Sequence, residues 1–210
     1  MSFFDGHLQE RGVLWNFCCL QEVRPLDPDH ECSHCWLRAT GGPWLPPALV
    51  VHRSSLSCVK KTWVGYHVAA AMLCIQSVHV LAMSVYLPGV RHGMEAFQQA
   101  LREVGSVVCD ARSLYSHVQL MLGLDANVEL SFGSDGDEFD SLGLVGPLVH
   151  PSLGPRSARA SAFLAWCIEF QAFVCNTFPH GLGHDLACWT RRPWSDTGRL
   201  TQIDLHSQKC

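Results

Sequence analysis

The sequence has few charged residues and no excess of positive charge. Only 16% of its 210 residues are charged, and 19 acidic against 15 basic side chains give a net charge of −4 at pH 7. This balance excludes a protein that grips nucleic acid with a broadly basic surface, so a polyanion would have to be bound by a local patch or a metal ion. The 48% of hydrophobic residues can form a core, which excludes a disordered chain. We expect a single domain over residues 1–210.

A secretory signal is also missing. The first eleven residues include Asp5, Glu10 and Arg11 and lack the apolar stretch of a signal peptide. The chain has 11 cysteines, an odd number, and thiols stay reduced inside cells. We therefore expect an intracellular protein with free cysteines.

One apolar run, from His67 to Val90, is long enough to raise the question of a membrane span. Gln76, Ser77 and His79 lie in its middle, where polar groups would be costly in lipid. Two buried strands joined near residues 75–78 explain the run better, so we predict no transmembrane segment.

Hydrophobic periodicity predicts a mixed order of strands and helices. Met94, Phe97, Leu101, Val104 and Val108 recur every three or four residues and would line one face of a helix. The predicted helices are residues 93–112 and 157–173, the predicted strands are 48–53, 63–72, 78–87, 117–124, 187–190 and 201–205, and the predicted loops are 25–47 and 133–154. This order suits an α/β (α+β) fold in which two packed sheets have helices outside.

Short motifs place polar side chains at the ends of the apolar segments. Glu22 follows residues 13–20, and a carboxylate there can bind a hard cation such as Mg²⁺. Tyr86 ends the central strand, where its hydroxyl can donate to a phosphoryl oxygen. Asp125 and Asn127 are two residues apart, so both face one side of an extended chain and can hold or deprotonate a water. Asp204 could orient a histidine. Taken alone, each is also compatible with an ordinary strand end or turn.

Taken in order, these motifs resemble the endonuclease/exonuclease/phosphatase family, in particular the endonuclease domains of non-LTR retroelements. That family has a Leu-Gln-Glu step, a Val-Val-basic strand, Tyr-x-Pro, Gly-Asp-x-Asn, Asn-Thr, Trp-Thr and Ile-Asp. The matching segments here are Leu20–Glu22, Val50–Arg53, Val80–Pro88, Gly123–Asn127, Asn176-Thr177, Trp189-Thr190 and Ile203-Asp204. They cover about residues 13–207. Seven segments in the family's order are far more specific than any single motif.

The resemblance implies a four-layer α/β/β/α sandwich of two mixed sheets flanked by helices. It implies that the protein hydrolyses a phosphodiester in DNA and that this reaction depends on Mg²⁺ or Mn²⁺. It also implies a location in the nucleus, and no obligate protein partner can be inferred. Glu22 would be a metal ligand and Tyr86 a phosphate contact. Asp125 would orient or deprotonate the nucleophilic water with Asn127 as its partner, and Asp204 would orient the family's catalytic histidine.

The sequence departs from the family pattern at three points. The family has an Asn-bearing strand well before its Leu-Gln-Glu step, and Asn16 lies too close to that step. The Ser-Asp-His step that follows Ile-Asp is not found, and His206 lies in the Ile-Asp strand itself. Leu124 is inserted between Gly123 and Asp125. We therefore expect a domain truncated at both ends. Two alternatives stay open: a non-catalytic remnant of such a domain, or a phosphatase of the same fold that acts on a small phosphoester.

Two further clusters have competing interpretations. His30–Cys35 contains a Cys-x2-Cys pair beside two histidines, which is half of a zinc site, but a matched second half is absent nearby and coincidence is favoured. The acidic residues of 135–140 do not fit the calcium-loop spacing, so we expect a solvated loop.

A third cluster is basic and aromatic. It comprises Arg191, Arg192, Trp194 and Arg199. These side chains could bind nucleic acid by phosphate contacts and stacking. The alternative is a hairpin that simply faces solvent.

Overall fold

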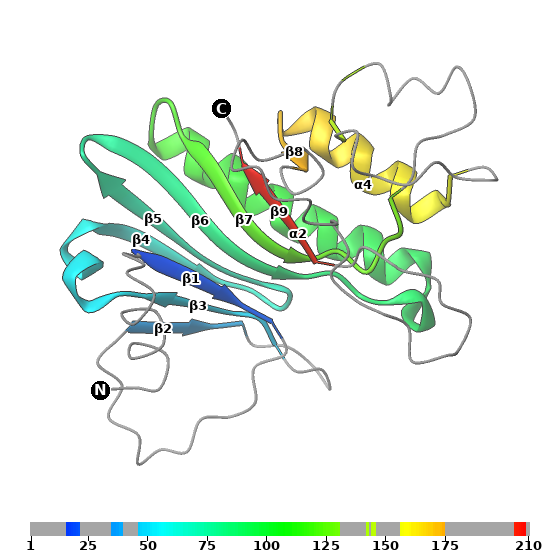
Figure 1. The fold of residues 1–210 in the computed structure, drawn as a ribbon, viewed down its shortest axis with the longest axis horizontal. Helices are drawn as coiled ribbons and strands as arrows, with labels where there is room; N and C mark the ends of the chain where they lie inside the picture. The colour runs from blue at the N-terminus through cyan, green and yellow to red at the C-terminus, as the bar shows by residue number, and fades with distance from the viewer. Residues whose placement is uncertain are drawn as a thin grey trace, which may run out of the picture.

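The structure, a computed structural model, describes residues 16–21, 35–39, 46–130, 142, 144–145, 156–174 and 204–208. Of residues 35, 36, 38, 173, 174 and 204–208 it describes the backbone alone. The described part has two sheets with helices packed on one face of the larger sheet (Figure 1). The predicted strand 187–190 lies outside the described residues.

The larger sheet has six strands in the order β4-β5-β6-β7-β9-β8. Their bounds are β4 Val59–Val64, β5 Val68–Ile75, β6 Val78–Tyr86, β7 Gln119–Asp125, β8 Phe173–Val174 and β9 Asp204–Gln208. β6 and β7 are parallel and the other neighbours are antiparallel, so the sheet is mixed. A parallel pair needs a long crossover, and the helix α2 (Gly93–Leu114), preceded by the short 3-10 helix η2 (Val90–His92), provides it.

The smaller sheet packs on the opposite face from α2 and α4 (Ala158–Glu169) (Figure 1). It has three strands in the order β1-β3-β2, with bounds β1 Phe17–Leu20, β2 Cys35–Arg38 and β3 Ala48–Val51, and the 3-10 helix η1 (Arg53–Cys58) follows it. Both of its described pairs are antiparallel, so among the described residues only the larger sheet is mixed. The described residues form the α, β and β layers of the expected sandwich, and they include no α-helix outside the smaller sheet.

The side chains of β5 alternate between two cores. Val68, Ala70 and Met72 pack under the helices, whereas Ala69, Ala71 and Leu73 face the smaller sheet, and all six are fully buried. A strand covered on both faces has apolar residues at every position, which explains the apolar run in the sequence. The alanines on the second face are small, so they let the two sheets approach closely.

The apolar run from His67 to Val90 contains the predicted pair of strands. β5 and β6 pair from Val68↔Val85 to Ile75↔Val78, and Gln76 and Ser77 form the turn with φ of 49° and 68°. Two consecutive residues with positive φ are typical of the tight turn that joins the strands of a hairpin with a two-residue loop. Among the described residues, no helix is both long and apolar enough to span a membrane.

α2 confirms the predicted helix. Phe97, Leu101, Val104 and Val108 are buried against the large sheet, and Met94 packs at the margin of the same core. α4 begins where the Ser157 hydroxyl accepts the backbone N–H of Ala160 (3.2 Å), as a helix N-cap does.

Three predicted boundaries were wrong. The predicted loop 25–47 contains the strand β2. The predicted strand 63–72 is two strands, because the chain turns at residues 65–67 between β4 and β5. The predicted helix 157–173 ends at Glu169, where Gln171 adopts a φ of 52° and the chain enters β8.

Candidate active site

Three of the residues expected in the site lie on adjacent strands of the large sheet, where β6 and β7 end and β9 begins. We call this row of strand ends the Tyr86–Asp125 edge. Tyr86 ends β6 and Asp125 ends β7, and these two residues are paired in the parallel ladder. Asp204 begins β9 and is paired with Asp125 in the antiparallel ladder. The ends of β6 and β7 and the start of β9 meet at one place (Figure 1). Backbone pairing therefore brings together residues that the sequence separates by up to 118 positions (204 − 86).

Tyr86 and Asp125 follow residues that belong to the helix-side core. Val85 and Leu124 pack under the helices. Because successive residues of a strand face opposite sides, Tyr86 and Asp125 lie on the side of the smaller sheet. Asp125 is 8% exposed and Tyr86 is half-buried, so the carboxylate lies at a protected edge.

The end of β1 is bonded to this part of the large sheet. Gln21 Nε2 donates to Ser84 Oγ (3.1 Å) and to the carbonyl of Gly123 (3.0 Å). Ser84 Oγ in turn donates to the carbonyl of Leu20 (2.9 Å). Ser84 is fully buried. These bonds attach the end of β1 to the large sheet close to the edge. The residues they reach lie two positions before Tyr86 on β6 and two positions before Asp125 on β7.

Gly123 is needed because the two sheets approach each other closely at this position. A Cβ at this position would lie 2.1 Å from Cys19 Cβ and 2.8 Å from its Sγ. Cys19 is held in place because its thiol donates to the carbonyl of Met83 (3.2 Å). Burial raises the pKa of Cys19 to about 12, so this thiol stays protonated and has a structural role.

Asp125 and Asn127 form a turn that closes the end of β7. Asp125 Oδ1 accepts the backbone N–H of Asn127 (3.1 Å), and Asn127 has a φ of 47°. Asparagine tolerates this left-handed conformation better than most residues. Asn127 Nδ2 donates to the carbonyl of Leu87 (2.8 Å), and Leu87 N–H donates to the carbonyl of Asp125 (2.9 Å). The Asn127 amide thus ties the segment after β6 to the segment after β7, and its Oδ1 is the atom that it can offer to a ligand.

A buried histidine borders the same edge. The carbonyl of His67 accepts the N–H of Tyr86 (3.0 Å), and the Glu103 carboxylate accepts the N–H of His67 (3.2 Å to Oε2). Burial lowers the pKa of His67, although the charge of Glu103 opposes that effect. His67 and Glu103 line a cavity of about 500 Å³ together with Tyr66, Pro88 and His92.

The other predicted site residues lie outside the described residues or are described in backbone only. Glu22 directly follows Gln21 but is not described, and neither are Arg191, Arg192, Trp194 and Arg199. Asp204 is described by its backbone position. Within the described side chains, no group of three or more His, Cys, Asp or Glu is placed to hold a metal ion. The oxygen donors of Tyr86, Asp125 and Asn127 are of the kind that suits a hard cation or a phosphoryl group.

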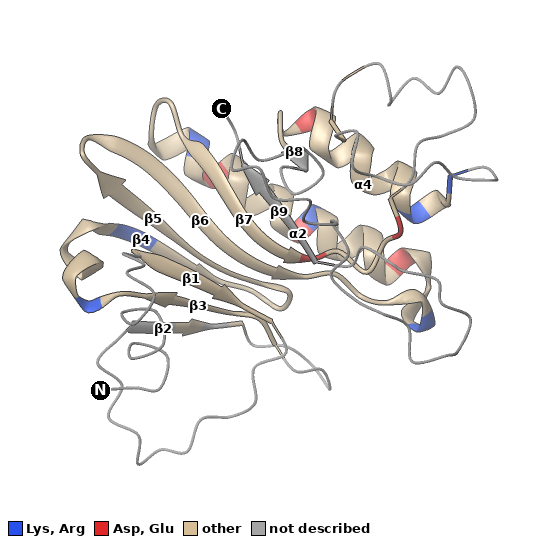
Figure 2. Cartoon of the chain, viewed as in Figure 1, with Lys and Arg blue, Asp and Glu red and all other residues tan. Residues whose placement is uncertain are grey.

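Charge is sparse on the described strands. Figure 2 shows most of the large sheet in tan, with blue on β4, which carries Lys60 and Lys61. Among the described strands, Lys or Arg occurs only on β4 and, as Arg38, on β2, which agrees with the low charge of the sequence.

Solved structures with similar architecture cover almost the whole chain. The TRAS1 endonuclease domain, from a telomere-specific non-LTR retrotransposon, aligns with 98% of this chain and 77% of its own, at 10% identity and a TM-score of 0.53. The 3′ phosphatase NExo from Neisseria, bound to a product DNA hairpin, aligns with 98% and 80%, at 15% identity and a TM-score of 0.59. A humanised TDP2 of D. rerio aligns with 98% and 74%, at 10% identity and a TM-score of 0.55. No family model and no curated protein matches the sequence.

The chain has the endonuclease/exonuclease/phosphatase fold. This confirms the expected resemblance at the level of the fold. In this fold the motif residues of β6, β7 and β9 meet at one edge. They are Tyr86, Asp125 and Asp204. Their assigned roles are predictions.

Sequence reasoning missed the residues that hold this edge together. Gln21 lies inside a predicted motif but has no predicted role of its own, and no role is predicted for Ser84 or Cys19. Gly123 could have been found, because an isolated glycine within a strand often marks a close approach of another backbone. The bond from Gln21 to Ser84 joins residues 63 positions apart and has no local sequence signal.

Proposed function

We propose that this chain is a divalent-metal phosphodiesterase domain of the endonuclease type that acts on DNA. The observation that supports this proposal is the register of three strands, which aligns Tyr86, Asp125 and Asp204 at one edge. The similarity to a retrotransposon endonuclease domain and to a DNA-bound 3′ phosphatase supports DNA as the substrate class.

The roles follow from the chemistry of the residues. Asp125 would orient or deprotonate the water that attacks phosphorus, and its burial favours a fixed orientation. Asn127 would hold the water or a phosphoryl oxygen through Oδ1. Tyr86 would donate its hydroxyl to a phosphoryl oxygen. Asp204 would orient a catalytic histidine, as the resemblance implies.

Mg²⁺ or Mn²⁺ is the implied metal. Glu22 would hold it, because Glu22 follows the β1 end that Gln21 bonds to Ser84 and Gly123. When bound, the cation neutralises the charge that develops on the phosphoryl group. Arg191, Arg192, Trp194 and Arg199 would supply the local contact to DNA that the acidic net charge requires.

Nicking of supercoiled plasmid in Mg²⁺ tests the proposal. Asp125→Asn should reduce nicking by about 10²–10⁴-fold, as loss of a general base does. Asp110→Asn is the matched control, because Asp110 bonds Lys61 and Trp63 instead of lying at the edge. Equal nicking by wild type and Asp125→Asn would refute the assignment, and absence of nicking in every metal tested would favour the non-catalytic alternative.

A phosphatase is the second candidate. NExo is described as a 3′ phosphatase and is similar to this chain over 98% of the chain's length. Release of inorganic phosphate from a DNA hairpin with a 3′ phosphate, without cleavage of an internal phosphodiester, would favour this candidate over the endonuclease.

A further inference from the structure

The segment from Leu87 to Gly93 connects the Tyr86 strand end to α2. Its carbonyl groups are held from two sides. On one side Asn127 Nδ2 donates to Leu87 O (2.8 Å). On the other side the Arg159 guanidinium, from α4, donates to Pro88 O, to Gly89 O (3.0 Å) and to Gly93 O (2.7 Å).

The guanidinium of Arg159 is itself fixed by the core. It lies 4.8 Å above the ring of Phe97, which is fully buried between α2 and the large sheet. A cation over an aromatic face gains electrostatic attraction, and the planar fork of arginine presents several N–H groups in a rigid arrangement. Arg159 therefore links three carbonyl groups of one short segment to the packed helices.

We propose that Arg159 is a positioning residue that sets where Tyr86 lies relative to Asp125. Two backbone bonds hold the chain at the point where Tyr86 leads into this segment. Leu87 N–H donates to the Asp125 carbonyl (2.9 Å), and Tyr86 N–H donates to the His67 carbonyl (3.0 Å). If Pro88 and Gly89 shift, Leu87 and its neighbour Tyr86 shift with them. The effect on catalysis rests on the proposed function, whereas the effect on Tyr86 does not.

The position of Tyr86 can be measured without any activity. The chain contains three tyrosines, so 3-fluorotyrosine labelling gives three ¹⁹F resonances that Tyr→Phe variants assign. Arg159→Met keeps an aliphatic stem on the Phe97 ring but removes every donor. We expect it to shift or split the Tyr86 resonance and to leave Tyr115, at the far end of α2, unchanged.

Arg102→Met is the matched control. Arg102 is exposed on α2 and donates to the side chain of Gln99 (2.7 Å and 3.2 Å). It should move neither the Tyr86 nor the Tyr115 resonance. An unmoved Tyr86 resonance in folded Arg159→Met would overturn the proposal, as would equal movement of all three tyrosines.

The second measurement is a double-mutant cycle on the rate of DNA cleavage. Arg159→Met should lower kcat about 10- to 100-fold with little change in KM, because a small misplacement of a positioning group acts on the reacting geometry. In a Tyr86→Phe background the same change should have almost no further effect. Full additivity of the two effects would show that Arg159 does not act through Tyr86.

The two measurements fail in different ways. A chain without hydrolytic activity refutes the proposed function, yet the ¹⁹F experiment still decides whether Arg159 positions Tyr86. A shifted Tyr86 resonance with unchanged kcat would overturn the catalytic consequence alone. If Arg159→Met does not fold, Arg159→Lys retains one donor centre and should give an intermediate shift, whereas a wild-type spectrum would count against the proposal.

Discussion

At the scale of single residues, the Tyr86–Asp125 edge depends on contact between two sheets at Gly123. A methyl group there would overlap Cys19, whose Cβ would be 2.1 Å away. Relief requires β1 to move, because the overlapping atom is attached to its backbone. We expect Gly123→Ala to destabilise the protein by about 1–3 kcal/mol, the usual cost of overpacking. Urea unfolding of the variant measures this loss.

Gly89→Ala is the control for that change. Its new Cβ would lie 3.7 Å from Asn127 Oδ1, an ordinary contact, and Gly89 has a φ of −66° that any residue adopts. Its free energy of unfolding should stay within about 0.5 kcal/mol of wild type. Equal unfolding midpoints for the two glycine variants would show that β1 does not press against Gly123.

Ser84 is the polar link between the two sheets. Its hydroxyl accepts from Gln21 and donates to the Leu20 carbonyl, and it is fully buried. Ser84→Ala leaves both partners without this bond, which should cost about 1–3 kcal/mol. Ser106→Ala, an exposed change on α2, should cost far less. Thermal unfolding compares the two variants, and equal melting temperatures would contradict the assigned contact.

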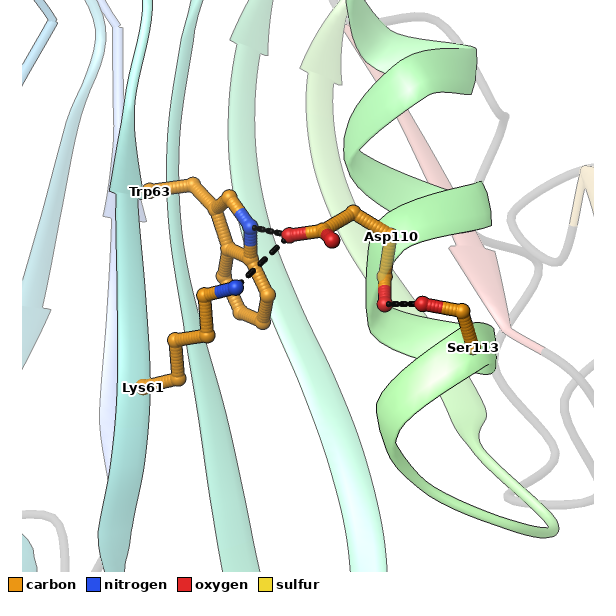
Figure 3. Close-up of polar contacts among 4 residues, drawn as sticks. All are labelled: Lys61, Trp63, Asp110 and Ser113. Atoms are coloured by element: carbon orange, nitrogen blue, oxygen red, sulfur yellow. Dashed lines mark hydrogen bonds and ion pairs between the residues drawn. The ribbon is translucent and has the colours of Figure 1, made fainter.

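At the scale of elements, a polar cluster joins the edge strand β4 to α2 (Figure 3). Asp110 Oδ2 accepts from Lys61 Nζ (2.8 Å) and from Trp63 Nε1 (2.6 Å). Lys61 also lies 4.9 Å from the centroid of the Trp63 ring. Because β4 is an edge strand of the large sheet, these bonds attach it to the helix layer independently of its pairing with β5.

The cluster should make stability depend on pH. The hydrogen bonds from Lys61 and Trp63 hold the pKa of Asp110 below its ordinary value of 3.8. A carboxyl group whose pKa is lower in the folded state stabilises the protein above the unfolded pKa, and this stabilisation is lost as the pH falls through the folded pKa. We expect the difference in unfolding free energy between wild type and Asp110→Asn to be constant from pH 7 to 5 and to shrink below pH 4. A difference that does not change with pH would contradict the pairing.

Elements with strong periodicity were predictable, and elements that depend on distant partners were not. The helix α2 and the β5–β6 pair follow from local apolar spacing, which burial on one or both faces imposes. β2 has only four residues and is stabilised by its pairing with β3, so the local sequence pattern does not predict it. The same reason applies to the site: motif order indicated Tyr86, Asp125 and Asp204, whereas their alignment depends on ladders that no local pattern specifies.

At the scale of the whole molecule, the negative net charge bears on how a polyanion would be held. A chain with a formal charge of −4 repels DNA at long range, so binding depends on local charges. A divalent cation at the Tyr86–Asp125 edge would be the strongest of them. Removal of the cation with a chelator should therefore weaken DNA binding as well as cleavage, and band shifts with and without chelator compare the two states.

If a divalent cation binds as proposed, it should also stabilise the fold, because a ligand that binds only the folded state shifts unfolding by mass action. At Mg²⁺ ten-fold above its Kd, the gain should be about 1.4 kcal/mol. Glu22→Gln should abolish this gain if Glu22 is the metal ligand, whereas Glu169→Gln, on the exposed side of α4, should retain it. Urea unfolding with and without Mg²⁺ measures the gain. If Glu22→Gln is stabilised as much as wild type, the cation binds elsewhere and the role assigned to the end of β1 is wrong.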